Sequence, residues 1–169
     1  MTSPRGFAKL FTAIAATLFL TACGNHAGHQ MQTGAEVISG DLKISSGWAR
    51  AVEAPAKTSA VYMKISNDGA TADKLLSVSS DVAEVSEVHQ SLEEDGVAMM
   101  RRVRGLEIPA GGMVSLEPGS YHVMLINVKG DIPEDSTVPL LLTFENAGEV
   151  SVEAVARKTD GGHGHHAGH

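Results

Sequence analysis

Two histidines and two methionines in the middle of this chain have the types and spacing to bind a soft metal ion. His122 and Met124 are separated by one residue, so in a β-strand both side chains would leave the same face, roughly 6.5 to 7 Å apart. His89 and Met100 flank Glu94-Asp95-Gly96, a turn sequence that predicts a hairpin bringing its two arms together. Two such pairs on neighbouring strands would supply four ligands.

These donor types favour monovalent copper. Thioether sulfur is a soft, neutral ligand, and together with imidazole it selects Cu(I) over hard cations. Such a set needs no thiolate, so it suits an oxidising compartment. Taken singly, a methionine in a strand is usually core filler and a histidine can be an ordinary surface residue, so the prediction depends on the joint arrangement. Met99 should face away from Met100, and we assign it to the core or as a spare ligand.

Other metal sites and catalysis are disfavoured by composition. The chain has eight histidines and one cysteine, and only His89 and His122 lie in the predicted folded part. That part cannot build a zinc site of three or four histidines, and it lacks the thiolate of a blue-copper site. There is no candidate nucleophile with a base, and four ligands leave no open position for substrate, so we expect no enzyme. A formal charge of -7 also argues against nucleic-acid binding.

The elements that must position the four residues are short strands separated by turns. Ser59–Ser66 alternates clearly, with Val61, Met63 and Ile65 on one face. We find no long helical periodicity beyond the N-terminal segment, so the pattern predicts an antiparallel β-sandwich or Greek-key barrel over residues 36–157. The other predicted strands are Val37–Ile44, Leu75–Ser79, Val82–Leu92, Val97–Val103, Leu106–Ile108, Met113–Leu116, Tyr121–Val128, Val138–Phe144 and Val150–Val155.

The N-terminus is typical of a lipoprotein signal peptide, predicted to span residues 1–22. Arg5 and Lys9 precede the apolar run Leu10–Leu20, which is too short for an ordinary membrane span. Leu20-Thr21-Ala22-Cys23 resembles the lipobox, in which cleavage leaves the cysteine as the lipidated first residue. The alternative is a plain signal peptide followed by a chance cysteine. We expect an extracytoplasmic, periplasmic protein anchored to a membrane through Cys23.

Both ends of the mature chain carry further metal donors. Residues 23–35 are predicted to be the lipidated cysteine and a flexible tether, and residues 158–169 a flexible His-rich tail. Gly-spaced imidazoles can bind Cu(II), Zn(II) or Ni(II) loosely, so the C-terminal tail is predicted to bind a divalent metal such as Cu(II). The alternative is an expression tag, although tags are usually uninterrupted runs of histidine. The candidate auxiliary donors are His26, His29, Met31, His163, His165, His166 and His169.

The four central residues and their surroundings resemble the PCuAC-type periplasmic copper chaperones. The pattern of that family is His, ten residues, Met, twenty-one residues, His, one residue and Met, and the intervals 90–99, 101–121 and 123 reproduce it here. The flanking sequences Gly96–Arg101 and Pro118–Leu125 match as well, and the resemblance covers about Val37–Arg157. One departure is Ser91, where family members often carry a second methionine.

The resemblance implies a cupredoxin-like antiparallel β-sandwich. It also implies a protein that carries Cu(I) outside the cytoplasm and delivers it for assembly of the copper centres of cytochrome c oxidase. Its partner would be a copper-bearing oxidase subunit or another copper chaperone, and we expect a monomer. Two alternatives stay open: a copper-sequestering or resistance protein using the same ligands, and a β-sandwich adhesion or assembly module in which the methionines and histidines are incidental.

Overall fold

The computed structural model describes residues 34–94 and 96–159, so the predicted signal peptide, Cys23 and the histidine-bearing parts of both tails lie outside the described residues. Within that part the regular structure is entirely β, and no helix there is long and apolar enough to cross a membrane. The strands are β1 (Val37–Ser39), β2 (Leu42–Arg50), β3 (Thr58–Asn67), β4 (Asp73–Ser79), β5 (Ala83–Glu94), β6 (Val97–Arg102), β7 (Leu106–Ile108), β8 (Gly112–Leu116), β9 (Tyr121–Val128), β10 (Thr137–Phe144) and β11 (Glu149–Arg157).

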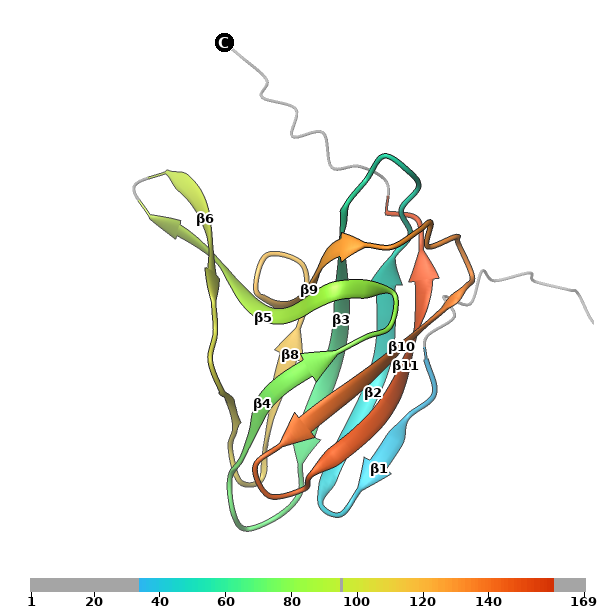
Figure 1. The fold of residues 1–169 in the computed structure, drawn as a ribbon. Coiled ribbons are helices and arrows are strands. Elements are labelled where there is room, and N and C mark those ends of the chain that lie inside the picture. The colour runs from blue at the N-terminus through green and yellow to red at the C-terminus, as the bar shows by residue number, and fades with distance from the viewer. Residues whose placement is uncertain (1–33, 95, 160–169) are drawn as a thin grey trace, which may run out of the picture. The chain divides into compact units, whose positions relative to one another are not determined.

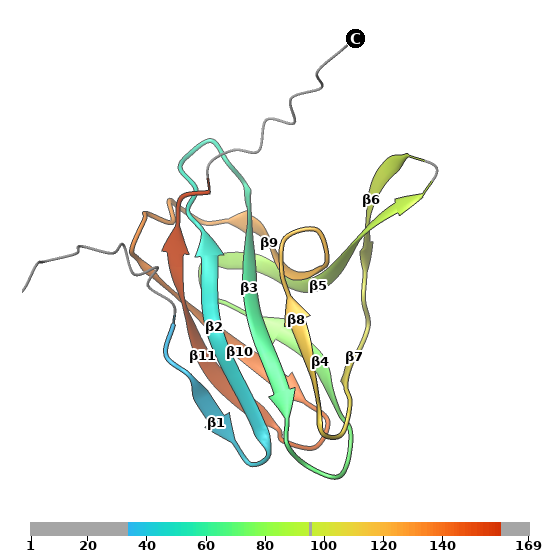
Figure 2. The ribbon, with the colours of Figure 1, turned by 180° about the vertical axis from the view of Figure 1, so that it is seen from behind.

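The strands join edge to edge in the order β6-β5-β9-β8-β3-β2-β11-β10-β4-β7, with β1 beside β2 and a further pairing of β9 with β3. Figures 1 and 2 show this path wrapped into two layers, with β4 and β10 across from β2, β3 and β8. The predicted all-β architecture is confirmed. One correction is needed: the pairings of β11 with β2 and of β8 with β9 are parallel, so the sheet is mixed.

Apolar side chains at every second strand position fill the space between the layers. Val61, Met63 and Ile65 on β3 are all buried, as the alternation predicts. On β9, Val123 and Leu125 are completely buried in the same core. Because successive strand residues point to opposite faces, the residues between them on β9 project away from this core.

The predicted strand Val37–Ile44 is in fact two strands. Gly40 adopts a φ of 58° and turns the chain between β1 and β2, a conformation that glycine adopts at little cost. Strand β2 then continues to Arg50, well beyond the predicted end. Its pairing with β3 shifts register between Ser45 and Trp48, so a bulge accommodates a serine- and glycine-rich stretch that reads as a loop.

Candidate metal centre

Three adjacent strands, β6, β5 and β9, bring the four predicted ligands to one face of the sheet. His89 on β5 lies directly opposite His122 on β9, and Met124 follows two residues after His122. Met100 on β6 lies opposite Ser91, which follows two residues after His89. Directly paired residues share a face, and so do residues two apart in one strand. We call the set His89, Met100, His122 and Met124 the donor face.

The register differs in one respect from a simple pairing of His89 with Met100. The residue opposite His89 on β6 is Arg102, so Met100 is the diagonal neighbour of His89. Diagonal positions are about 7 to 8 Å apart, still within reach of a long side chain. Ser91 is the residue that directly faces Met100.

His122 is the most enclosed member of the donor face, and His89 lies beside it. Their ring centroids are 6.0 Å apart, and His122 is only 4% exposed. Burial holds the pKa of His122 below its ordinary value. A hydrogen bond between Nδ1 and the Ser120 carbonyl opposes this effect, and the charges of His89 and Arg50 add to the lowering. The lowered pKa favours the neutral ring of His122, the form that a metal ligand requires.

His89 has one engaged nitrogen and one free nitrogen. Its Nε2 lies 3.1 Å from Oε2 of Glu87, which is two residues earlier on the same face of β5. Its Nδ1 is buried and has no hydrogen-bond partner among the described residues. A buried polar atom without a partner is rare in folded proteins and indicates a missing ligand, ion or water. This orphaned nitrogen is an observation that fits a metal ion at the donor face.

The two thioethers differ in their surroundings. Met124 is half-buried between its cross-strand neighbours Glu87 on β5 and Ala60 on β3. Met100 is 64% exposed on β6, all of which is exposed. Met99 is 37% exposed and lies opposite Leu92, on the other face of the hairpin. The suggestion that Met99 belongs to the core is wrong, because its side chain is exposed. Strand β6 extends away from the sandwich (Figures 1 and 2).

The part of the chain that the structure describes contains no group of three or more histidine, cysteine, aspartate or glutamate side chains placed to hold a metal ion. The further side-chain donors on the donor face are the thioethers of Met100 and Met124. Sulfur donors suit a soft metal ion better than calcium or magnesium, which prefer oxygen.

An aromatic row behind His122 was not predicted from the sequence. The rings of Tyr62 and His122 are 6.3 Å apart, and those of Trp48 and Tyr62 are 4.3 Å apart. The guanidinium of Arg157 lies 5.5 Å from the Trp48 ring, which makes a cation–π contact. These contacts restrict the rotation of His122. The sequence offered no signal for them, because they depend on the pairing of β2 with β3 and of β3 with β9.

The fold matches known proteins. A family model described as "Putative lipoprotein LpqE-like" matches residues 42–156, most of the described chain. This chain belongs to the LpqE-like family. The putative lipoprotein Lxx21020 of Leifsonia xyli subsp. xyli (strain CTCB07) is 27% identical over 159 residues, which cover 94% of this chain and 93% of that relative. The uncharacterized protein RP573 of Rickettsia prowazekii (strain Madrid E) is 29% identical over 103 residues, 59% and 57% of the two chains.

Solved structures of PCuAC domains are similar as well. The copper-bound PCuAC domain from PmoF2 superposes with a TM-score of 0.64 at 26% identity, covering 74% of this chain and 99% of that domain. The solution structure of CuI-DR1885 from Deinococcus radiodurans gives a TM-score of 0.56 at 26% identity, with 68% and 76% covered. These matches confirm the resemblance to PCuAC-type proteins and the cupredoxin-like sandwich.

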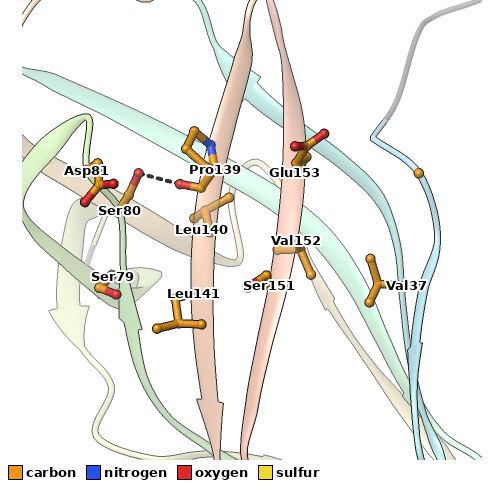
Figure 3. Close-up of a pocket in the computed structure, with 11 residues that line it drawn as sticks. Val37, Ser79, Ser80, Asp81, Pro139, Leu140, Leu141, Ser151, Val152 and Glu153 are labelled. Carbon is orange, nitrogen blue, oxygen red and sulfur yellow. Dashed lines mark hydrogen bonds between the residues drawn. The ribbon is translucent and has the colours of Figure 1, made fainter.

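The LpqE-like domain also has a recess of about 530 Å³ away from the donor face. It is lined from β1, the end of β4, β10 and β11, and Figure 3 shows the Ser80 hydroxyl donating a hydrogen bond of 2.6 Å to the Pro139 carbonyl at its rim. None of its lining residues is a histidine, methionine or cysteine. The recess therefore has no ligands for a soft metal.

Proposed function

We propose that this chain is an extracytoplasmic Cu(I) carrier that binds one copper ion through the donor face. The observation that carries the proposal is the pair of imidazole rings, 6.0 Å apart on a face that also bears two thioethers. Metal–imidazole bonds are about 2 Å long, so one ion between the rings can bond to both. Two imidazoles and two thioethers form a neutral, soft set, which favours Cu(I).

The comparisons support copper as the metal. Two similar structures are described by their names as copper-bound, one of them in the Cu(I) state. A shared fold alone would not carry a ligand from one protein to another. Here the donors that could bind it are present at the intervals of the family pattern, which makes the transfer of function specific.

We further propose that the protein delivers its copper, with cytochrome c oxidase copper centres as the destination and a copper-bearing subunit or a second chaperone as the recipient. The exposure of Met100 favours delivery, because a partner with soft donors of its own can replace this thioether first. The enclosed imidazoles would hold the ion until the exchange is complete. A protein that only sequesters copper would gain nothing from an exposed ligand.

The test has two steps and uses the mature chain as a monomer. Titration against a Cu(I) chelator should find one tight site, and no binding above that of an unrelated β-sandwich contradicts the proposal. Mixing the loaded protein with a purified oxidase CuA domain should then move copper to that domain. Retention of the copper under the same conditions supports the alternative, a sequestering or resistance protein.

We also propose that Cys23 anchors the protein to a membrane. The support is the lipobox-like sequence and membership of a family described as lipoprotein. Cell fractionation should find the natural protein with membranes and the Cys23→Ser variant in the soluble extracytoplasmic fraction. Equal solubility of the two forms would contradict lipid anchoring.

A further inference from the structure

The carboxylate of Glu87 is engaged on both of its oxygens. Oε2 lies 3.1 Å from Nε2 of His89, and Oε1 forms an ion pair with Nη1 of Arg102 at 2.8 Å. Glu87 is only 18% exposed, so its contacts are shielded from water. A carboxylate is an acceptor only, so the proton of this contact must be carried by Nε2 of His89.

A neutral imidazole with its proton on Nε2 has its lone pair on Nδ1. Nδ1 of His89 is the buried nitrogen that has no partner among the described residues. His122 has the opposite arrangement. Its Nδ1 is bonded to the Ser120 carbonyl at 3.2 Å, which leaves the lone pair on Nε2. The two histidines therefore present different nitrogens.

We propose that Glu87 is a positioning residue of the copper site, which holds His89 in the Nε2–H tautomer so that His89 binds Cu(I) through Nδ1 while His122 binds through Nε2. This inference rests on the function proposed above. Histidines that bind metals commonly donate their other N–H to a carboxylate, which fixes the ring and raises its basicity. Arg102 completes the arrangement, because its ion pair holds the Glu87 carboxylate against β5 and β6.

The carboxylate of Glu87 also affects the net charge around a bound copper ion. A Cu(I) ion bound by two imidazoles and two thioethers leaves a net positive charge in a partly enclosed site. Glu87 places a negative charge beside His89, and its ion pair with Arg102 offsets part of that charge. The residue thus acts through His89, without any need to contact the ion.

Nitrogen-15 NMR of histidine-labelled mature protein tests the tautomer directly. Before loading, we expect His89 to show a protonated Nε2 and an unprotonated Nδ1. After addition of one equivalent of Cu(I), the large shift change should fall on Nδ1 of His89 and on Nε2 of His122. A large change on Nε2 of His89 instead would overturn the inference, because Glu87 would then have to leave that nitrogen.

Three variants test the role of the carboxylate. Glu87→Ala should lower Cu(I) affinity by about 10- to 100-fold, the usual effect of losing such an outer partner. Glu87→Gln should lose less, because its amide oxygen can still accept the Nε2 proton. The matched control is Glu84→Gln, which removes the same charge from the same strand at a residue that contacts Asn127 and not His89; it should leave the affinity unchanged.

A reference variant separates the two proposals. If His89→Ala abolishes tight binding but Glu87→Ala and Glu87→Gln bind like the natural protein, this inference is wrong and the copper site stands. If His89→Ala itself leaves the affinity unchanged, the proposed copper site is wrong, and the positioning role falls with it. Thermal melts of each variant show whether the protein compared is folded.

Discussion

The donor face combines two regions of opposite character. On β5 and β9 the imidazoles are enclosed, with His122 only 4% exposed and packed against Tyr62. On β6 every residue is exposed, and Met100 is 64% exposed. Figure 1 shows the reason: β9 lies inside the sheet between β5 and β8, whereas β6 is its last strand and extends away from the sandwich with the end of β5.

This difference indicates a site that is half preorganised and half adaptable. Ligands held by packing lose little conformational freedom when the metal binds, so they contribute most of the affinity. An exposed methionine loses more freedom and contributes less, but a partner can reach it. We therefore expect substitution of an enclosed ligand to lower the Cu(I) affinity more than substitution of an exposed one.

The largest expected effect is that of His122→Ala. Cu(I) affinity should fall by more than about 100-fold, beyond the range typical of a lost outer-shell partner, because the variant removes the most enclosed ligand. Competition with a Cu(I) chelator measures the loss, and circular dichroism checks that the protein is still folded. If His122→Ala lowered the affinity less than Met100→Leu does, the exposed strand β6 would contribute more to Cu(I) binding than the enclosed imidazoles, contrary to this prediction.

The second prediction concerns Asp73 at the start of β4, where a change in stability should be independent of copper binding. Burial by itself would raise the pKa of Asp73, but the backbone N–H groups of Asn146, Lys74 and Ala147 outweigh it, and the pKa lies below its ordinary value. Such a carboxylate stabilises the fold at neutral pH, and the stabilisation disappears as the pH falls through the lowered pKa.

Asp73→Asn should therefore lower the free energy of unfolding at pH 7 by about 2 kcal/mol, since hydrogen bonds to a charged group are lost. The difference from the natural protein should shrink in acid, and Cu(I) affinity should not change. Urea unfolding at several pH values is the measurement. Asp68→Asn is the control, because its ion pair with Lys43 is on the surface, where such pairs add little to stability. If Asp73→Asn lowered the Cu(I) affinity, the positioning of the ligands on β5 and β9 would depend on the stability of the whole domain.

The third prediction compares two neighbours on β6. Met100→Leu should lower Cu(I) affinity by about tenfold, equivalent to about 1.4 kcal/mol. Stability should change by less than about 0.5 kcal/mol, because the side chain is exposed. Met99→Leu is the matched control, since it lies on the opposite face, and it should have no effect. If both variants lost the same Cu(I) affinity, the side of β6 on which a methionine lies would not decide whether it binds copper.

The smallest expected effect is that of the His-rich tail. A chain ending at Thr159 should keep the Cu(I) affinity of the full mature chain, because tail imidazoles must be ordered before they converge on a metal. Extra Cu(II) sites should appear only in the full chain. They should be lost as the pH falls below about 6.5, where imidazoles become protonated. Loss of tight Cu(I) binding on truncation would mean that the tail supplies a ligand.

Much of the donor face could be predicted because its signals are local. His122 and Met124 share a face through the alternation of one strand, and Glu94-Asp95-Gly96 marked the hairpin, with Gly96 at a φ of 76° in the turn. The split of Val37–Ile44 was missed, because Gly40 is a single turn residue inside an otherwise strand-like stretch. Glu87 was also missed, although its position two residues before His89 already indicated a shared face.

The sequence by itself determined the donor types, their intervals and the face on which each strand carries them. Side chains alternate with a period of two wherever the backbone is extended, whatever the strand pairs with. The tertiary structure alone decided that His89 faces His122, that Met100 is diagonal to His89, and that one half of the site is buried and the other open. Register and burial depend on which strands become neighbours, and core packing between residues distant in the chain sets that choice.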